Sequence, residues 1–126
     1  MSQENELPPW LKEQISRLQQ LQQNLQAIMM QKQQIELEIV ETERALEELN
    51  KITTSDSIYK AAGPLLIKSE KDTIEKELGE KKELANTRVM VLGKQESRVK
   101  ENLKEVENKI NQMLKGTQST QSTTQK

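Results

Sequence analysis

The chain has 126 residues, of which 31% are charged, and its formal net charge at pH 7 is −1. This near balance gives no overall case for binding nucleic acid or an anionic membrane. Trp10 and Tyr59 are its two aromatic residues, so a conventional globular core is difficult to build, and the abundant Glu, Lys, Gln and Leu favour long helices or a coiled coil instead.

The sequence contains no Cys and no His. Thiol nucleophiles, disulfides, the usual zinc ligands and the most common general base are therefore excluded. No glycine stands in a phosphate-binding motif of the GxxxxGK[ST] type. No apolar run approaches the ~18 residues of a membrane helix, and the polar, acidic residues 1–7 do not resemble a signal peptide. We expect a soluble cytoplasmic protein that is not an enzyme and uses no cofactor or metal.

The first predicted element is a helix over residues 9–51, which Pro8 and Pro9 can begin because missing N–H groups cost little there. Twelve positions with a strict 3,4 spacing follow, nine of them apolar, which predicts a coiled-coil seam. Met29 and Met30 flank this seam and are expected to pack in the middle of the coil, with adaptable contacts to a binding partner as the alternative. The seam positions are Leu11, Gln14, Leu18, Leu21, Leu25, Ile28, Lys32, Ile35, Ile39, Thr42, Leu46 and Leu49.

Residues 53–57 end this helix, because their Thr, Ser and Asp side chains compete with the backbone for hydrogen bonds. Two short extended segments, 58–62 and 65–68, then flank Gly63-Pro64. Glycine permits the bend there, and proline prevents a helix from continuing. We predict a small β-hairpin over residues 58–68. Such a hairpin is marginal alone in water, and its unpaired edges point to assembly with other chains.

A second helix is predicted over residues 72–115, with Asp72 as its N-cap and Glu75 completing a capping box. Nine of the eleven positions of its seam are apolar. Residues 116–126 are rich in Ser, Thr and Gln and predict a disordered tail. The seam positions are Leu78, Lys82, Ala85, Val89, Leu92, Glu96, Val99, Leu103, Val106, Ile110 and Met113.

The two predicted helices match in length, each spanning roughly 65 Å at ~1.5 Å per residue. The chain is therefore expected to fold back on itself as a mainly α protein. We predict one module over residues 1–115, a long antiparallel coiled-coil hairpin. Both termini would lie at one tip of the coil and the small β-hairpin at the other end.

The segment Ile58-Tyr59-Lys60-Ala61-Ala62-Gly63-Pro64-Leu65-Leu66-Ile67-Lys68 resembles the prefoldin beta-type family. Members of that family have a hydrophobic-Tyr-Lys start, a Gly at this point and an apolar second strand. The order of long helix, single hairpin and long helix over residues 8–115 is also similar to the family, as are the Leu-Gln-Gln repeats at residues 18–23. Alpha-type subunits carry two hairpins, and this chain has room for one.

The resemblance implies an ATP-independent molecular chaperone subunit. Two alpha and four beta subunits would form a hexamer, in which the hairpins join into an intersubunit β-barrel. Unfolded polypeptides would be captured at the coil tips and delivered to a group II chaperonin, with no nucleic acid or membrane partner. The alternative function is a passive coiled-coil scaffold or tether that binds no client.

Two groups of candidate residues follow. The hairpin group would pair strands between subunits, and the competing interpretation is a hairpin that merely caps the coil. This group comprises Ile58, Tyr59, Leu65, Leu66 and Ile67. The tip group would offer apolar surface to unfolded clients. The alternatives are a staple that pins the helix start around Trp10 and, on the second helix, simple closure of the coil. This group comprises Leu7, Trp10, Leu11, Ile15, Ile110, Met113 and Leu114.

Overall fold

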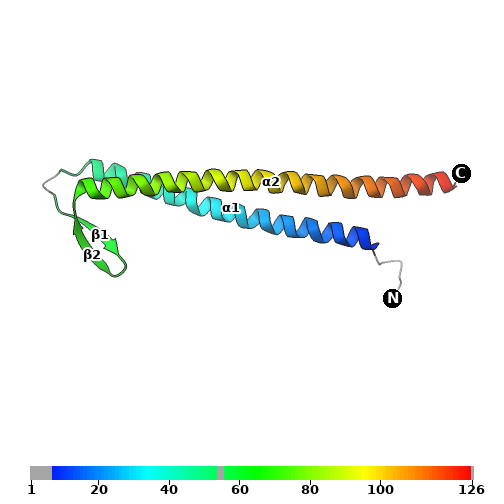
Figure 1. The fold of residues 1–126 in the computed structure, drawn as a ribbon, viewed down its shortest axis with the longest axis horizontal. Coiled ribbons are helices and arrows are strands. Elements are labelled where there is room, and N and C mark those ends of the chain that lie inside the picture. The colour runs from blue at the N-terminus through cyan, green and yellow to red at the C-terminus, as the bar shows by residue number, and fades with distance from the viewer. Residues whose placement is uncertain (1–6, 54–55, 126) are drawn as a thin grey trace. The chain divides into compact units, whose positions relative to one another are not determined.

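The computed structural model describes residues 7–53 and 56–125, with side chains described as far as Gly116. The elements follow the order α1 (Pro9–Asn50), β1 (Ile58–Ala62), β2 (Leu65–Ser69) and α2 (Lys71–Gln125) (Figure 1). The protein is therefore mainly helical, with two long helices and one small antiparallel β-hairpin, and the predicted fold class is confirmed. The joining of hairpins into a barrel between subunits stays a prediction.

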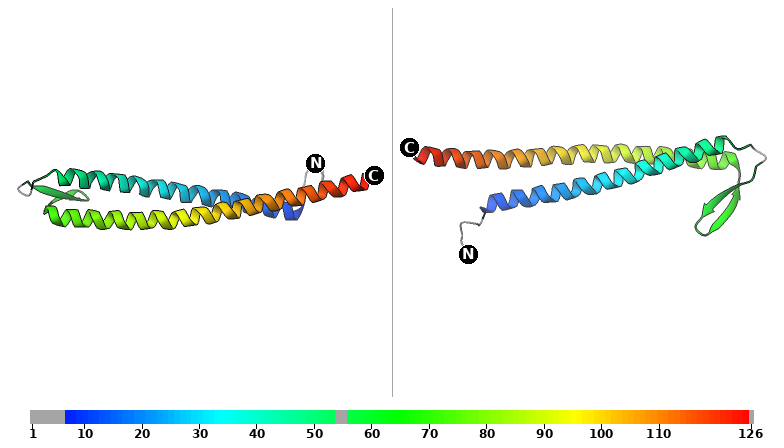
Figure 2. Two further views of the ribbon diagram at one scale, coloured as in Figure 1. Left: turned by 90° about the horizontal axis from the view of Figure 1, so that it is seen from above. Right: turned by 180° about the vertical axis from the view of Figure 1, so that it is seen from behind.

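The chain forms two compact units. The first comprises Met1–Met29 and Lys94–Lys126, and the second comprises Met30–Gly93. In each unit a stretch of α1 runs beside a stretch of α2 in the opposite direction (Figure 2). The start of α1 and the end of α2 thus belong to the first unit, and the β-hairpin belongs to the second.

The start and end of α1 are set by local hydrogen bonds. The Pro8 carbonyl accepts from the N–H groups of Leu11 and Lys12 at 3.1 and 3.0 Å, so the prolines stand where a helix needs no N–H donor. At the other end, the Ile52 N–H donates to the Leu49 carbonyl at 3.2 Å. This bond spans three residues instead of the four of an α-helix, so the last turn is of the tighter 3₁₀ type that often ends a helix.

A side-chain cap follows. The backbone N–H and the hydroxyl of Thr53 both donate to Oδ2 of Asp56, at 3.1 and 3.0 Å. These bonds offer the backbone an alternative to the helix ladder, which is why the helix stops where the sequence predicts a turn.

Burial follows the predicted seams. All twelve seam positions on α1 and all eleven on α2 are buried or half-buried. In the first unit the most buried apolar side chains are Leu11, Leu103 and Val106. In the second unit they are Ile35, Leu49, Ala85 and Leu92. The 3,4 spacing therefore identified the faces along which the two helices pack.

Two polar seam residues of the second unit, Thr42 and Lys82, have partners. Thr42, which is 5% exposed, donates its hydroxyl proton to the Glu38 carbonyl at 2.7 Å and so satisfies its buried oxygen. The seam residue Lys82 places its ammonium 3.7 Å from the Glu43 carboxylate on α1, an ion pair between the two helices. A lysine can occupy the seam in this way because its aliphatic stem packs while its charged end reaches the rim.

The turn of the hairpin depends on Gly63 and Pro64. Gly63 has a φ of 60°, a conformation that side-chain-bearing residues rarely adopt. Pro64 cannot take a positive φ, so a type I′ turn is excluded and the type II′ turn, with glycine first, is the two-residue turn that suits these residues. The strands pair antiparallel, with Ala62 opposite Leu65 beside the turn and Ile58 opposite Ser69 at the open end.

The bounds of α2 differ from those expected. The Glu70 carbonyl accepts the first helical bond, from Ile74 at 3.1 Å, so Glu70 rather than Asp72 is the N-cap residue. Asp72 lies inside the first turn, where its negative charge still interacts favourably with the helix dipole.

At its other end α2 continues to Gln125, past residue 115. Gln, Ser and Thr do not break a helix as proline does. The disordered tail and the single module over residues 1–115 stay predictions.

Candidate functional site

The hairpin group of residues is assembled on the two strands as the sequence predicts, and most of it faces solvent. Tyr59, Leu65, Leu66 and Ile67 are 57%, 63%, 72% and 49% exposed, whereas Ile58 is half-buried. Large apolar side chains exposed to this degree beside one another are characteristic of an interaction surface.

The pairing register places these side chains on both faces of the hairpin. Successive residues of a strand point to opposite faces. Tyr59 opposite Lys68 and Ala61 opposite Leu66 thus share one face, while Leu65 and Ile67 lie on the other. Among the described residues, both faces carry exposed apolar side chains, so the hairpin has two apolar surfaces rather than one.

The strand edges are the second feature of the hairpin. Over the described part of the chain, the sheet consists of β1 and β2 alone, each paired only with the other. Each strand therefore has an outer edge whose N–H and C=O groups can pair with a further strand. Backbone donors and acceptors beside apolar side chains are what strand addition between chains requires.

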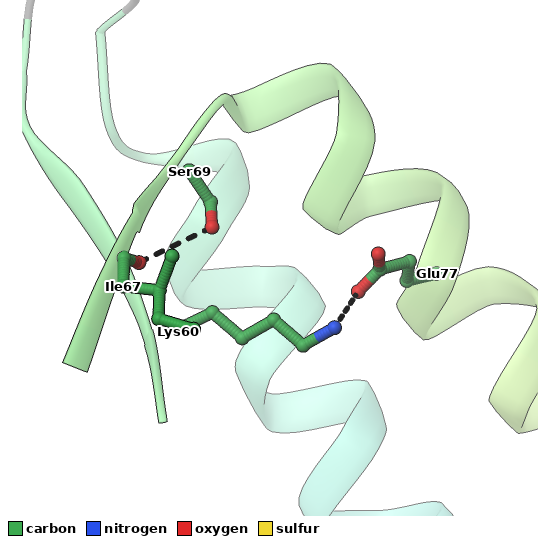
Figure 3. Close-up of polar contacts among 4 residues, drawn as sticks. All are labelled: Lys60, Ile67, Ser69 and Glu77. Carbon is green, nitrogen blue, oxygen red and sulfur yellow. Dashed lines mark hydrogen bonds and ion pairs between the residues drawn. The ribbon is translucent and has the colours of Figure 1, made fainter. Parts of the chain in front are cut away.

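An ion pair joins the hairpin to α2, and a further hydrogen bond lies within β2 (Figure 3). Nζ of Lys60 on β1 lies 2.8 Å from Oε2 of Glu77 on α2, and the Ser69 hydroxyl donates to the Ile67 carbonyl at 3.2 Å. Lys71, the first residue of α2, donates from Nζ to the Ile52 carbonyl just after α1, at 2.8 Å. All three contacts lie within the second unit. The Lys60–Glu77 pair links the hairpin to α2, the Ser69–Ile67 bond lies within β2, and the Lys71–Ile52 bond links the start of α2 to the residues just after α1.

All residues of the tip group lie in the first unit, but they differ in how far they are buried. Leu11 is 8% exposed and belongs to the packed seam, while Leu7 and Leu114 are 43% and 41% exposed. The remaining members are half-buried: Trp10, Ile15, Ile110 and Met113. Leu7 and Leu114 are accessible as they stand, whereas Leu11 can reach a ligand only if the end of the coil opens.

Several exposed apolar residues lie along the helices outside both groups. Met30 is 69% exposed and Met29 43%, so the prediction that they pack within the coil is wrong. They fall outside the 3,4 spacing of the α1 seam, and one neighbouring helix covers only that seam. Three further apolar residues, which are not among the candidates expected from the sequence, fall outside the α2 seam in the same way. These are Leu84, Met90 and Val91, with 63%, 65% and 49% of their surface exposed.

The exposed surfaces of the hairpin and the helices carry many large apolar side chains. Among the residues whose placement is described, no group of three or more Asp or Glu side chains could hold a metal ion. In that same part of the chain, neither helix has a stretch apolar enough to cross a membrane. The surfaces instead offer aliphatic and aromatic groups, thioethers, amides and strand edges.

Comparison with known proteins gives a consistent result. The sequence profile of the prefoldin subunit family matches residues 12–117. The chain is 42% identical over 109 residues to "Prefoldin subunit beta" of Archaeoglobus fulgidus, covering 86% of this chain and 94% of that protein. It is 41% identical over 108 residues to the protein of the same name from Saccharolobus islandicus, covering 86% of each.

Solved structures agree with the sequence relatives. The crystal structure of the prefoldin beta subunit from Thermococcus strain KS-1 has a TM-score of 0.79 and 35% identity, covering 86% of this chain and 96% of that one. The beta2 subunit of the same strain has a TM-score of 0.65 and 26% identity, over 72% of this chain and 97% of that one. The two long helices, the single hairpin and these relatives together show that the chain belongs to the prefoldin family and is a subunit of the beta type.

Proposed function

We propose that the chain is a non-enzymatic, ATP-independent holdase subunit that assembles through its hairpin and holds unfolded polypeptides on its coil. The observation that carries this proposal is the hairpin, which has free strand edges and apolar side chains on both faces. A single chain cannot cover these surfaces, so they favour an assembly of several subunits.

The assembly that we propose is a hexamer of two prefoldin alpha subunits and four copies of this chain. Strand edges that pair around a closed ring leave no edge exposed. In a barrel of this kind the apolar face that includes Leu66 or the one that includes Leu65 would fill the interior. The hairpin group, from Ile58 to Ile67, is then the oligomerisation surface.

Clients would be held at the tip group of the first unit. Leu7 and Leu114 supply exposed apolar surface, and the half-buried Trp10 and Met113 lie in the same unit. Helix ends open locally at little cost in free energy, so fraying adds seam residues to the contact surface. Apolar contact without a shaped pocket selects for unfolded chains rather than for one sequence.

The proposal needs no nucleotide, cofactor or metal. We place the activity in the cytoplasm, with delivery of the held polypeptide to a group II chaperonin and without a nucleic acid or membrane partner. Subunits of a family that works as a non-enzymatic chaperone need only binding surfaces, and the described residues provide them.

Mass in solution and aggregation kinetics test the proposal. Mixing the chain with a prefoldin alpha subunit is expected to give a heterohexamer with fewer alpha than beta chains, and this complex should slow the aggregation of a chemically unfolded protein without ATP. A complex that forms and yet leaves aggregation unchanged contradicts the holdase activity.

A second candidate function, a passive scaffold or tether, is favoured by the burial of the seam within a single chain. All the predicted seam positions are already buried or half-buried within one chain, so the coil needs no partner helix. A passive scaffold or tether could use such a coil with the hairpin as a simple turn. A mass unaffected by the alpha subunit would favour this second function.

A further inference from the structure

One stretch of α1 differs sharply from the rest of the chain in charge. No Asp, Glu, Lys or Arg occurs from Leu18 to Gln31, although charged residues make up 31% of the protein. The four seam positions in this stretch, Leu18, Leu21, Leu25 and Ile28, are all apolar. Apart from Ala27, Met29 and Met30, its outward positions carry carboxamides instead of charges: Gln19, Gln20, Gln22, Gln23, Asn24, Gln26 and Gln31.

Part of this stretch lines a shallow cleft in the first unit, with a volume of about 620 Å³. Four exposed glutamines border it, together with the half-buried Leu25 and with Met29, which is 43% exposed. The glutamines recur at the spacing i, i+3, i+4 and i+7, so they lie on one face of the helix. They are Gln19, Gln22, Gln23 and Gln26.

The four carboxamides are available for a ligand. Within the described residues none of them takes part in a hydrogen bond. Each carries an acceptor oxygen and two N–H donors, the same groups that a peptide bond presents. A glutamine can therefore bond the backbone of another chain whatever its sequence.

The spacing also suits an extended chain. Gln19 and Gln26 stand seven residues apart, which is about 10 Å along a helix axis. Three residues of an extended chain cover about the same distance. The thioether of Met29 and the side chain of Leu25 add apolar surface that adapts to different side chains.

We propose that this cleft, which we call the amide cleft, binds the extended backbone of an unfolded polypeptide through the carboxamides of Gln19, Gln22, Gln23 and Gln26. This inference rests on the proposed holdase function and names the chemistry recognised: neutral peptide groups of an extended segment. The lack of charge is the reason, since a charged group of a ligand finds no ion-pair partner among the cleft residues. The carboxamides can instead replace the hydrogen bonds that a neutral backbone gives up when it leaves water.

The test uses the full chain and a short neutral peptide of alternating Ser and Leu with blocked ends. A second peptide of the same sequence is N-methylated at alternate backbone amides, which removes donors and leaves the side chains unchanged. Calorimetric titration is expected to show binding about tenfold weaker for the N-methylated peptide. The double variant Gln22→Ala/Gln26→Ala should bind the unmethylated peptide several-fold more weakly and respond less to methylation. Alanine is the best helix former, so α1 is retained, which circular dichroism checks.

The matched control is Gln95→Ala/Gln112→Ala, which removes two exposed glutamines of α2 outside the cleft. It should bind both peptides as the unchanged chain does. Equal binding of the two peptides by the unchanged chain overturns the proposal. So does a Gln22→Ala/Gln26→Ala variant that binds normally, or one that instead loses self-association, since a second copy would then cover the cleft.

The holdase function is measured separately, as the slowing of aggregation by the hexamer. Normal slowing together with equal binding of the two peptides overturns the amide cleft and leaves the proposed function standing. Methylation-sensitive peptide binding without any slowing supports the amide cleft and contradicts the holdase function.

Discussion

Lys60 and Glu77 form an ion pair between β1 and α2, with Nζ and Oε2 2.8 Å apart (Figure 3). The two residues are separated by seventeen positions in the sequence, and their side chains are 48% and 46% exposed. At that exposure solvent screens the pair, so its contribution to stability is small. The main effect of the ion pair is geometric, because it fixes the orientation of the exposed hairpin relative to α2.

Breaking this ion pair should alter assembly more than folding. Lys60→Gln, Glu77→Gln and the double variant are expected to give a coupling free energy of about 0.2–1 kcal/mol in denaturant unfolding. The same variants should assemble more slowly with an alpha subunit, because the hairpin is less well oriented. Salt near 1 M, where the Debye length is about 3 Å, should reduce the coupling. A charge-reversed pair, Lys60→Glu/Glu77→Lys, should restore it, and a coupling that persists at high salt would rule out an ion pair as its origin.

Leu66→Ser should abolish hexamer formation while leaving the isolated chain as stable as before. Leu66 is 72% exposed, so the isolated fold does not depend on its burial. In an assembled barrel the substitution would remove the apolar burial that Leu66 provides and would bury the serine hydroxyl without a hydrogen-bond partner. Leu84→Ser is the control, since Leu84 is 63% exposed on α2. If both variants assemble equally well, judged by mass in solution, the hairpin face that carries Leu66 is not the assembly surface.

Alanine should have opposite effects at two glycines. Gly63 has a φ of 60°, so Gly63→Ala forces a side chain into a disfavoured conformation and should weaken the hairpin by about 1 kcal/mol or more. Gly79 lies inside α2, and a Cβ there meets nothing within 4 Å. Gly79→Ala should therefore stabilise the chain by roughly 0.5–1 kcal/mol. Thermal unfolding of both variants measures the difference, and shifts of the same sign would contradict the backbone argument.

Two residues of α1 two positions apart should respond very differently to truncation. Ile35 is 5% exposed in the seam, and Leu37 is 57% exposed. Ile35→Ala should lower the free energy of unfolding by about 2 kcal/mol or more, because the neighbouring side chains fill only part of the space that the isoleucine leaves. Leu37→Ala should change it by about 0.5 kcal/mol or less. Denaturant unfolding compares them, and similar losses would mean that another surface covers Leu37 in solution.

The tip residues should affect clients without affecting stability. Leu7→Ser/Leu114→Ser removes the two exposed members of the tip group. In the assembled hexamer this variant is expected to slow the aggregation of an unfolded protein less than the unchanged chain does, with the same melting temperature and mass. The control is Leu103→Ala, which is 9% exposed and should lower the melting temperature instead. A Leu7→Ser/Leu114→Ser hexamer with full activity would remove the tip from the client surface.

Local patterns were sufficient for the main elements. The 3,4 spacing from Leu11 to Leu49 predicted which side chains of α1 are covered, because a helix repeats its faces at a fixed period. Gly63-Pro64 predicted the turn, because only glycine tolerates the φ that the turn needs. The resemblance of residues 58–68 to prefoldin beta subunits, confirmed by the comparisons, named the family.

Other features required the tertiary structure. Met30 and Leu37 are apolar yet exposed, and their type alone could not show that only one helix face is covered. The pairing of Lys60 with Glu77 and the exposure of both hairpin faces depend on where the chain places distant segments. Sequence periodicity reports contacts along one element, because neighbours on a helix or strand are set by its own geometry. Contacts between elements are decided by the path of the whole chain, and only the folded structure contains that path.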